Sequence, residues 1–565
     1  MKKTFNLNKY LLLLRIISDR KKKRYFAIAL VIILQAIAGI FENLSVISLI
    51  PLLSLFIKST VDKTEGVNDF FINSLNFIGL EPSVLSLLLI TTSLIILKVS
   101  FSFLSSVFIT FMVEKVKLKK RIGIIKKISE SRWEFCDRLS SSKVSSSINL
   151  EIPRIGEAFR HLLITLGNIS FIIFYFVTAS ILSLKITFLI LVLGTIKLSI
   201  TKFFSSIISK LGKKLTLINN NLNLKVVENI QNLKILKSME KENDLQKGLL
   251  KEVFNIRDNF FWITLVNSFH KSLDEFITFL IFASLVLYLS DSLYSEIFVT
   301  GVIFVIFSRL IGRISKIQSD ILIMNKNINA FENYNNIISD FKDTKILNGK
   351  MKFMFSKSIK LENVKIGFGK KIILKSININ FFPGQSYVIF GRSGIGKSTL
   401  GELIMGLRIQ KDGKILFDGL NQSTYNLILW RKEIGFSPQT PYFFYGTIKE
   451  NLTFFDPNVN FKRIENALEI SDSLSFVNEL PKKLNTILQE GGKNLSSGQL
   501  QRLSIARAII FGKKMLILDE ATSNLNTESE KKVLKNILKQ KNITKIFISH
   551  NNLFKKYIKN QIKLA

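Results

Sequence analysis

The sequence predicts an all-α transmembrane domain of six helices at residues 1–325, followed by an α/β P-loop nucleotide-binding domain at residues 356–565. Long apolar runs dominate the first part, and several exceed the ~20 residues that a helix needs to cross the hydrocarbon core of a bilayer. From Ile359 onwards, short β-branched and aromatic segments alternate with turns and helices, which is typical of an α/β domain. Between them, residues 326–355 are polar and rich in Asn and Lys, which predicts a linker.

Six apolar segments are the predicted spans: Tyr25–Ile57, Val84–Val113, Leu162–Leu184, Ile186–Ile208, Phe276–Leu289 and Ile297–Ser308. The first is longer than the apolar region of a signal peptide, so it is expected to remain as an anchor. The last two are shorter than a span and are expected to continue into polar helix. Apolar residues also recur at helical spacing in Val226–Lys237, so the helices of spans 2 to 5 are expected to extend beyond the bilayer. The serine-rich stretch Ser140–Ser147 predicts a turn or a short helix.

The net charge of +37 fits either a nucleic-acid-binding protein or a membrane protein whose cytoplasmic face meets anionic lipid. Basic residues gather in 1–24, Glu114–Arg160 and Lys210–Asp258, whereas Lys58–Ser83 and Ser290–Glu296 contain few or none. Because basic connections lie on the cytoplasmic side, this alternation places the nucleotide-binding domain in the cytoplasm. It also explains the excess charge without nucleic acid as a partner. The expected location is the inner (plasma) membrane.

Charged residues within the predicted spans are candidates for lining a central cavity, because burying them in lipid is costly. They are Glu42, Lys98, Lys197, Asp274, Glu275 and Arg309. For Lys197 and Arg309, extension of the side chain to the membrane interface is an equally open interpretation. His161 and His270 lie near span ends and are expected to be packing or interface residues.

The most specific motif lies at Gly391–Ser398, which matches the P-loop pattern G-x-x-x-x-G-K-[ST] after a short buried strand and before a helix. Glycines let several N–H groups and a helix N-terminus point at one anion. Lys397 is expected to reach the β- and γ-phosphates of ATP, and Ser398 to bind Mg²⁺. The predicted nucleotide-binding residues of this loop are Gly391, Arg392, Ser393, Gly394, Ile395, Gly396, Lys397, Ser398 and Thr399.

Three further motifs each end a predicted strand with a functional side chain. Gln439 ends one and offers an amide oxygen to Mg²⁺, and Asp519 ends another with a metal-binding carboxylate. Glu520 follows Asp519 and can polarise an attacking water molecule. The third strand ends at His550. A Ser/Gly turn at Leu495–Gln499, before a helix expected to open at Leu500, completes the set.

In this order and spacing, the motifs resemble those of ATP-binding cassette (ABC) transporters, specifically exporter-type half-transporters. The resemblance covers nearly the whole chain and implies a RecA-like core with a helical subdomain. It makes Gln439, Glu520 and His550 the expected catalytic residues, with His550 holding the γ-phosphate, and Phe368 the aromatic residue stacking on adenine. Leu495–Gln499 is similar to the family signature L-S-G-G-Q. The residues expected to complete the P-loop site of a second copy are Ser496, Ser497, Gly498 and Gln499.

Three positions depart from the family pattern. Ser497 replaces a signature glycine, which puts the strength of the γ-phosphate contact in doubt. Asn526 replaces the usual aspartate of the D-loop, the segment after Glu520, and this puts coupling between the two sites in doubt. Phe368 replaces the commoner tyrosine, and stacking needs only its ring.

The resemblance implies an ATP-hydrolysing exporter or flippase that works as a dimer by alternating access. A homodimer is the simplest partner arrangement, and a heterodimer remains open. Ile40–Pro51 is similar to bacterial flippases of lipid-linked oligosaccharides, so such a lipid or a related lipid is the expected cargo. The basic residues near the spans are candidates for holding its pyrophosphate, with contact to anionic membrane lipid as the alternative: Lys98, Lys197, Arg309 and Arg313. Multidrug, lipid A-like or peptide export are the alternatives, and no peptidase-like segment precedes the first span. The predicted spans argue against a non-transporting ATPase, and intact Glu520 argues against an ATP-gated channel.

Overall fold

The computed structural model describes residues 21–49, 51–52, 73, 75–77, 79, 81, 83–137, 139, 141–182, 184–289, 297–341, 349–368 and 371–564. They divide into two compact units. The helical unit comprises the described residues up to Ser129 and those from Leu139 to Lys342. The α/β unit comprises Glu130–Arg138 and the described residues from Asp343 onwards. Each unit has its own apolar cores, and each is described by itself.

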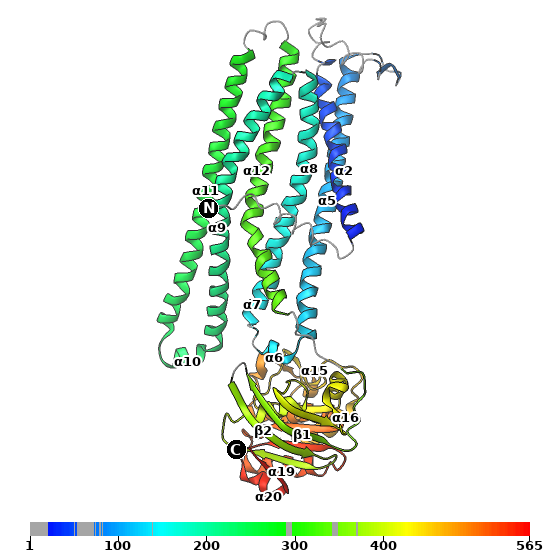
Figure 1. Ribbon diagram of the computed structural model, residues 1–565, viewed down its shortest axis with the longest axis vertical. Helices are drawn as coiled ribbons and strands as arrows, with labels where there is room; N and C mark the ends of the chain where they lie inside the picture. The colour runs from blue at the N-terminus through cyan, green and yellow to red at the C-terminus, as the bar shows by residue number, and fades with distance from the viewer. Residues whose placement is uncertain are drawn as a thin grey trace. The chain divides into compact units, whose positions relative to one another are not determined.

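Long helices build the helical unit (Figure 1): α2 (Lys21–Ile47), α5 (Val84–Glu130), α8 (Ile152–Leu182), α9 (Leu184–Gln231), α11 (Glu242–Leu289) and α12 (Ile297–Asp340). The predicted six-helix architecture is confirmed. With 48 residues each, α9 and α11 extend for roughly 70 Å. This is more than twice the ~30 Å thickness of a bilayer core, so these helices are longer than a membrane crossing requires, as predicted.

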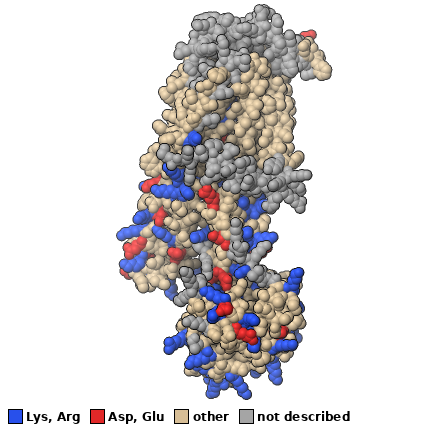
Figure 2. Space-filling view, in the orientation of Figure 1, with Lys and Arg blue, Asp and Glu red and all other residues tan. Residues whose placement is uncertain are grey.

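Among the described residues, three helices are apolar and long enough to cross a membrane by length and composition: Phe26–Ile47, Val84–Glu130 and Ser141–Ile181. The spans predicted within α9, α11 and α12 are helical, and their crossing of a membrane stays a prediction. Residues 53–57 of the first predicted span lie outside the described residues. On the face shown in Figure 2, Lys, Arg, Asp and Glu gather toward the end of the helical unit that bears α7 and α10, and the rest of the described surface is largely uncharged.

Several segments between the long helices, or after the last of them, are helical rather than irregular. The stretch Ser140–Ser147 contains the short helix α7 (Ser141–Ser146), followed by a π-helical turn, Ser147–Glu151, that leads into α8. The linker predicted at 326–355 differs from the structure at its start, because α12 continues through Asp340. Apolar residues at helical spacing, including Phe331 and Tyr334, bury that part of α12 in a core shared with α5 and α8. A second short helix, α10 (Leu233–Ser238), separates α9 from α11.

A parallel sheet forms the centre of the α/β unit, with strand order β11-β3-β10-β9-β6. Its strands are β3 (Ser386–Phe390), β6 (Ile434–Ser437), β9 (Met515–Asp519), β10 (Thr544–Ile548) and β11 (Asn560–Lys563). Every residue of β9 and β10 is buried, as in sheets covered on both faces. Helices α13 (Lys397–Ile404), α19 (Thr527–Leu538) and α20 (Asn552–Tyr557) follow β3, β9 and β10.

Two smaller parts complete this unit. An antiparallel sheet has the order β2-β1-β4-β5, with β1 (Ile359–Phe368), β2 (Lys371–Phe381), β4 (Asp412–Phe417) and β5 (Leu420–Asn421). The predicted helical subdomain has its own core and contains α15 (Ile448–Thr453), α16 (Phe461–Ile470), α17 (Leu474–Glu479), α18 (Ser497–Phe511) and the pair β7 (Gly446–Thr447) and β8 (Ile487–Leu488). The short helices α6 (Trp133–Cys136) and α14 (Leu427–Arg431) also belong to the α/β unit.

Candidate nucleotide-binding site

The carboxyl ends of four parallel strands bring the predicted motifs to one edge of the central sheet. The P-loop starts at Gly391 directly after β3, and Glu520 directly follows β9. Gln439 and His550 each come two residues after their strands, β6 and β10. Ligands of open α/β sheets bind at this edge, so the topology assembles segments that are far apart in sequence into one candidate site.

The P-loop adopts a backbone that requires glycine. Gly394 and Gly396 have φ values of 77° and 104°, in the left-handed region that other residues rarely adopt. A Cβ atom on Gly396 would lie 2.8 Å from the Cγ2 atom of Ile373. Helix α13 then begins at Lys397, as predicted, with Gly396 at its N-cap. Its free N–H groups therefore face the loop, which is the usual geometry for binding phosphate.

Lys397 is buried within this loop and contacts His550, the residue predicted to hold the γ-phosphate. Its Nζ atom donates to the carbonyl oxygens of Gly391 and Arg392, both at 3.1 Å. The same atom lies 2.7 Å from Nε2 of His550. A neutral imidazole can accept this hydrogen bond through Nε2. The lysine and the histidine, 153 positions apart, thus meet in one place.

Glu520 lies between two of its predicted companions. The amide of Gln439 donates to Oε2 of Glu520 at 2.7 Å, and Nε2 of His550 lies 3.2 Å from Oε1. Glu520 has a φ of 47°, and its N–H donates to the carbonyl of Ile548 at 2.9 Å. Lys397, His550, Glu520 and Gln439 thus lie in consecutive polar contact, and the hydrogen bond from Gln439 holds the carboxylate.

Asp519, the last residue of β9, supplies a buried carboxylate. It accepts a hydrogen bond from Ser398, and burial raises the pKa of Asp519. Because burial disfavours the ionised carboxylate, a nearby cation would stabilise it. The carboxylate of Asp519, the hydroxyl of Ser398 and the amide oxygen of Gln439 are all hard oxygen donors, as Mg²⁺ prefers. These residues therefore fit the predicted magnesium site.

The remaining predicted P-loop residues and Phe368 lie in the expected segments. Arg392, Ser393 and Ile395 belong to the loop itself, and Thr399 lies in the first turn of α13. Phe368 is the last residue of β1, where its backbone pairs with Lys371. The ring of Phe368 lies outside the described side chains, so its role toward adenine stays a prediction.

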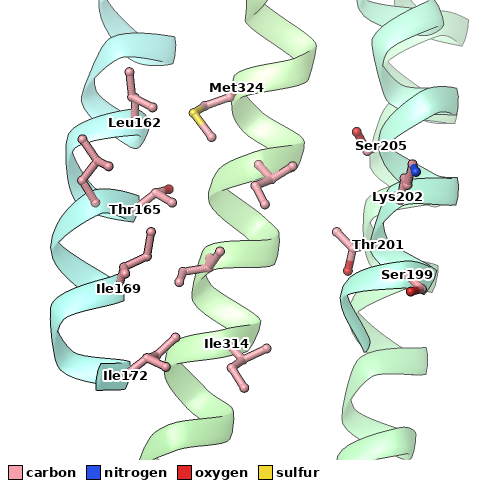
Figure 3. Close-up of a pocket in the computed structure, with 13 residues that line it drawn as sticks. Leu162, Thr165, Ile169, Ile172, Ser199, Thr201, Lys202, Ser205, Ile314 and Met324 are labelled. Atoms are coloured by element: carbon pink, nitrogen blue, oxygen red, sulfur yellow. The ribbon is translucent and has the colours of Figure 1, made fainter. Parts of the chain in front are cut away.

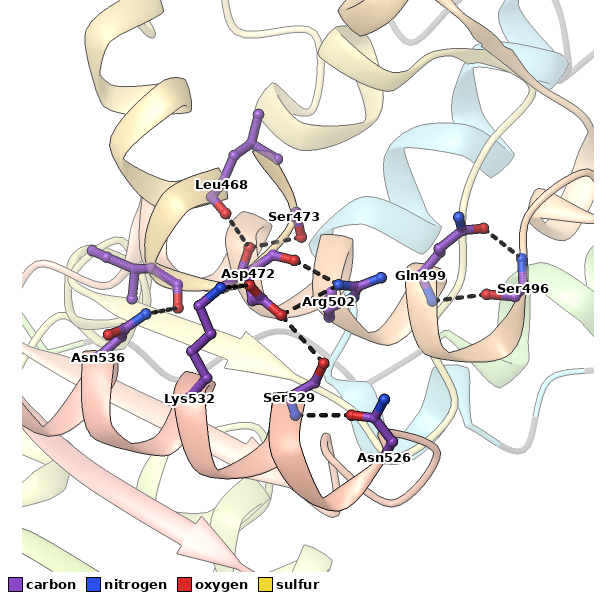
Figure 4. A network of polar contacts seen from close by, with 12 residues as sticks. Leu468, Asp472, Ser473, Ser496, Gln499, Arg502, Asn526, Ser529, Lys532 and Asn536 are labelled. Carbon is purple, nitrogen blue, oxygen red and sulfur yellow. Dashed lines mark hydrogen bonds and ion pairs between the residues drawn. The ribbon is translucent and has the colours of Figure 1, made fainter. Parts of the chain in front are cut away.

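The signature residues form the N-terminus of α18 (Figure 4). Ser496 is the N-cap: its hydroxyl accepts from the N–H of Gln499 at 3.2 Å, and the Gln499 side chain accepts from the N–H of Ser496 at 2.9 Å. The helix therefore begins at Ser497, three residues before the predicted Leu500. The pattern S-x-x-Q of a capping box was the available signal. Ser496 and Ser497 are exposed, so this helix end is free to meet another molecule.

Close packing joins the signature helix to the D-loop, Ser523–Asn526. Gln501 is buried, donates to the hydroxyl of Ser523 at 2.9 Å and accepts from the N–H of Asn524 at 2.8 Å. A Cβ atom on Gly498 would lie 3.1 Å from the carbonyl oxygen of Asn524. Asn526 caps α19 by accepting from the N–H of Ser529 at 2.8 Å. An aspartate would make the same bond, so the structure accommodates this departure locally.

Another buried group, Glu530, was not predicted from sequence. It accepts from the hydroxyl of Thr522 at 2.8 Å and from the amide of Asn551 at 2.7 Å. Thr522 and Asn551 are near neighbours in sequence of Glu520 and His550. Glu530 thus holds the two segments that present the catalytic candidates. Glu530 is one of two acidic residues in the first turn of α19, and nothing in the sequence distinguished it from Glu528.

The segment that follows α5 in the chain belongs to the α/β unit. The indole of Trp133 donates to Glu402 at 3.2 Å, and Asp137 pairs with Arg408 at 3.1 Å. Glu402 also pairs with Arg408 and lies in the last turns of α13, whose first residue is Lys397. The P-loop helix is therefore bound at one end to the nucleotide site and at the other to the continuation of α5.

In the helical unit, Glu42 is the centre of a cationic cluster. It accepts hydrogen bonds from Arg313 at 2.8 Å and from Tyr175 at 2.7 Å. Lys98 and Arg309 each lie 3.5 Å from its carboxylate. Glu42 is 3% exposed, whereas Arg309 is 53% exposed at its side chain. Three cations thus share one carboxylate in this cluster.

The other predicted cavity charges lie elsewhere. Lys197 is buried and pairs with Asp274 at 2.9 Å, so it does not extend to an interface. Asp274 and Glu275 line a groove of about 670 Å³ between α11 and α12. His161 lies 2.7 Å from Asp320, and His270 is buried beside Thr201. Both histidines thus lie within helix packing.

A second cavity of about 670 Å³ lies between α8, α9 and α12 (Figure 3). Helices α8 and α12 line it with mostly apolar side chains, such as Ile169 and Met324, and α9 contributes hydroxyl groups and Lys202. None of the six charged residues predicted to line a cavity is among its described lining residues.

The P-loop and the polar side chains at the carboxyl ends of the strands define the α/β unit as an ATP-binding domain. A helical membrane domain precedes it on the same chain. The chain belongs to the ABC transporter family: the ABC transporter transmembrane region matches residues 28–314, and the ABC transporter domain matches residues 374–523. This membership confirms the resemblance found in the motifs.

Two relatives show the range of functions in this family. The Lactococcin-G-processing and transport ATP-binding protein LagD of Lactococcus lactis subsp. lactis is 30% identical over 340 residues, 58% of this chain and 48% of LagD. The ATP-dependent lipid A-core flippase of Desulfotalea psychrophila is 37% identical over 199 residues, 35% of this chain and 34% of the flippase. The matched regions thus span about half and about a third of these relatives.

A solved structure shares the fold along nearly the whole chain. It is a bacterial Atm1-family ABC exporter with ATP bound, with a TM-score of 0.77 and 17% sequence identity. The match covers 96% of this chain and 93% of that chain. The predicted order of a helical membrane domain and an α/β ATP-binding domain is therefore confirmed.

Proposed function

We propose that this chain is one half of an ATP-hydrolysing exporter or flippase that works as a dimer by alternating access in the bacterial inner membrane. The polar contacts from Lys397 through His550 and Glu520 to Gln439 are the main support, because they bring a carboxylate, an imidazole and an amide together beside the P-loop lysine. The family to which the chain belongs uses such a domain to drive a membrane domain, and here both are on one chain.

The described contacts support a role for each of these residues. Glu520, held by the Gln439 amide, orients the attacking water and accepts its proton. Lys397 exchanges its contacts to the loop carbonyls for phosphate oxygens, and His550 then holds the γ-phosphate. Ser398, Asp519 and Gln439 would hold Mg²⁺, which would supply positive charge beside the β- and γ-phosphates.

The site is expected to be completed by a second copy. Ser496–Gln499 begin a helix whose exposed N-terminus suits the γ-phosphate of another molecule. One P-loop and one signature per chain make a homodimer with two sites the simplest arrangement. Glu520→Gln retains the hydrogen-bonding shape of the side chain and removes the base. We expect it to bind ATP, lose at least ~100-fold in turnover, and accumulate as a closed dimer in size-exclusion chromatography. Rapid turnover by this variant would remove Glu520 from its assigned role.

The proposed cargo is a lipid-linked oligosaccharide or a related anionic lipid. The cluster around Glu42 supports this choice, because three cations on one carboxylate leave positive charge that a phosphate or pyrophosphate group can neutralise. Of the four basic residues predicted to contact such a group, Lys98, Arg309 and Arg313 meet at Glu42. Lys197 is already neutralised by Asp274.

Peptide export is the second candidate, because the relative LagD is named for processing and transport of a lactococcin. Reconstituted vesicles can separate the cargos. They would contain a fluorescent polyprenyl-pyrophosphate sugar, a lipid A-like glycolipid, a plain phospholipid, a peptide or a dye, with the Glu520→Gln variant as the inactive control. ATP-dependent movement of the polyprenyl-pyrophosphate sugar supports the preferred cargo, and its absence, with movement of the peptide, refutes it.

The role of the cluster has its own control. Arg309→Gln is expected to weaken cargo-stimulated ATP hydrolysis, because its half-exposed guanidinium is available to a ligand. Lys316→Gln, an exposed residue two turns further along α12, removes the same charge outside the cluster and should have no effect. Equal effects of both substitutions would contradict a role for the cluster in binding.

A further inference from the structure

The loop Ser471–Ser473 lies where two apolar cores of the α/β unit meet. Just before it, Ile470 packs in the core that contains β9, β10 and α19. Just after it, Phe476 and Val477 pack in the core of the helical subdomain. Helix α18 contributes side chains to both cores. Polar contacts of this loop therefore lie at the boundary between the subdomain and the catalytic core.

Asp472, the middle residue of this loop, is held in an unusual backbone conformation. Its φ is 58°, a left-handed value that Asp and Asn adopt more readily than other non-glycine residues. The flanking Ser471 and Ser473 are fully buried, and their hydroxyls are 2.8 Å apart. The N–H of Ser473 also donates to the carbonyl of Leu468 at 2.7 Å. This bonding fixes the direction of the Asp472 carboxylate.

The carboxylate contacts two helices at once (Figure 4). From α19, Lys532 lies 2.5 Å away and the hydroxyl of Ser529 donates at 3.2 Å. From α18, Nη1 of Arg502 donates to the Asp472 carboxylate at 3.4 Å and to its carbonyl oxygen at 2.7 Å. The Arg502 guanidinium also stacks on the ring of Phe476, 4.8 Å from its centroid. Asp472 thus links the signature helix to the helix after the D-loop.

These two helices are connected to different parts of the expected composite site. Helix α18 presents the signature residues at its N-terminus, less than two turns before Arg502. Helix α19 contains Glu530, which holds the segments next to Glu520 and His550. We propose that Asp472 is a positioning residue for ATP hydrolysis, which locks α18 to α19 so that closure of the signature onto ATP aligns Glu520 in the same movement. This inference rests on the proposed hydrolysis between two copies.

The variant Asp472→Asn tests the lock with little change of shape. Asparagine tolerates the positive φ and leaves the backbone contact with Arg502 in place, but it removes the charge that Lys532 and Arg502 share. The full-length dimer in lipid nanodiscs is expected to lose about tenfold in kcat, the scale of a hydrogen bond to a charged group. The inhibition constant for ADP should stay unchanged, because ADP needs only the P-loop of its own chain.

Asn536→Ala is the matched control. It removes a contact of 3.5 Å from α19 to the carbonyl of Ile470, next to the same loop, without touching α18. Its kcat should stay within about twofold of the unaltered protein, as expected for a single weak neutral contact. An equal loss of kcat in this control would mean general loosening and would overturn the inference, as would a wild-type kcat in Asp472→Asn.

If Asp472→Asn fails to bind ADP, Arg502→Lys tests the same contact between Asp472 and α18 by changing its partner residue. It keeps the positive charge but loses the guanidinium, whose Nη1 atom donates to both oxygens of Asp472 and whose plane stacks on Phe476. The same selective loss of kcat is expected, and an unchanged kcat refutes the proposal. If the unaltered protein hydrolyses ATP and both variants do so equally well, only this inference fails. If the unaltered protein hydrolyses no ATP, the proposed function fails with it.

Discussion

Replacing Asp274 by Asn removes the negative charge from a buried ion pair that joins three helices. The Nζ atom of Lys197, on α9, lies 2.9 Å from Asp274 on α11, 2.8 Å from Thr278 and 3.1 Å from Ser315 on α12. Lys197 is 2% exposed. In the variant, the Lys197 ammonium keeps the hydroxyls of Thr278 and Ser315 as partners, but none of these three partners is then a carboxylate.

The expected cost follows from burial. Removing one partner of a buried ion pair typically costs about 3–5 kcal/mol, because the other charge stays buried without compensation. The neighbouring Glu275 is the matched control: it pairs with Lys271 at 3.9 Å and both side chains are well exposed. Such a pair contributes about 0–1 kcal/mol, so Glu275→Gln should have little effect.

Thermal unfolding of the full-length protein in lipid nanodiscs can measure the difference. ATP should raise the Tm of the α/β unit, so the transition that ATP does not shift reports on the helical unit. At roughly 2 °C per kcal/mol for a unit of this size, Asp274→Asn should lower that Tm by roughly 6–10 °C and Glu275→Gln by less than about 2 °C. Equal shifts would refute the assignment of Lys197 and Asp274 as a buried pair. The double variant Lys197→Met/Asp274→Leu should recover most of the loss.

Two further predictions concern the α/β unit. Gly396→Ala should abolish ATP binding measured by a fluorescent nucleotide, because the φ of 104° and the 2.8 Å approach to Ile373 leave no room for a methyl group; retained affinity would contradict this. Burial opposes ionisation of Asp418, but hydrogen bonds from the N–H groups of 356–358 outweigh it and hold the pKa of Asp418 below its ordinary value. This stabilisation is present above the ordinary pKa near 3.8 and is lost as the pH falls through the lower, folded-state pKa. Asp418→Asn should therefore reduce the Tm of this unit at pH 7 and weaken its decline below about pH 4, and an unaltered pH profile would exclude the effect.

The strand-end motifs could be predicted because their signals are local. A run such as Met515–Asp519 is buried on both faces and so has little sequence freedom, and the residue after it must lie at the carboxyl edge of the sheet. The helix start at Ser497 was missed because the capping box at Ser496 and Gln499 was interpreted as part of a turn. That error concerned one local signal that the sequence did contain.

Pairings between distant side chains could not be predicted in the same way. The cost of burying Glu42 marked it as functional, but its closest cation, Arg313, is 271 positions away and was proposed only as a contact for cargo. Likewise, Asp472 and Glu530 resemble ordinary surface acids in sequence. Their roles depend on which helices the fold brings together, and no periodicity encodes that.

The contacts of the α/β unit suggest how one nucleotide site can affect two distant places. Helix α13 is bound at Lys397 to the polar chain of the site and at Glu402 to Trp133, on the continuation of α5. Helix α19 connects the segments beside Glu520 and His550 to α18 through Asp472. Since a short helix moves as a rigid body, a shift at the P-loop is expected to move Trp133 and Asp137 within the same unit, and a shift at the strand ends is expected to move the signature residues. The connection to Trp133 uses α13 and the connection to the signature uses α19, so substitutions can disrupt one without the other.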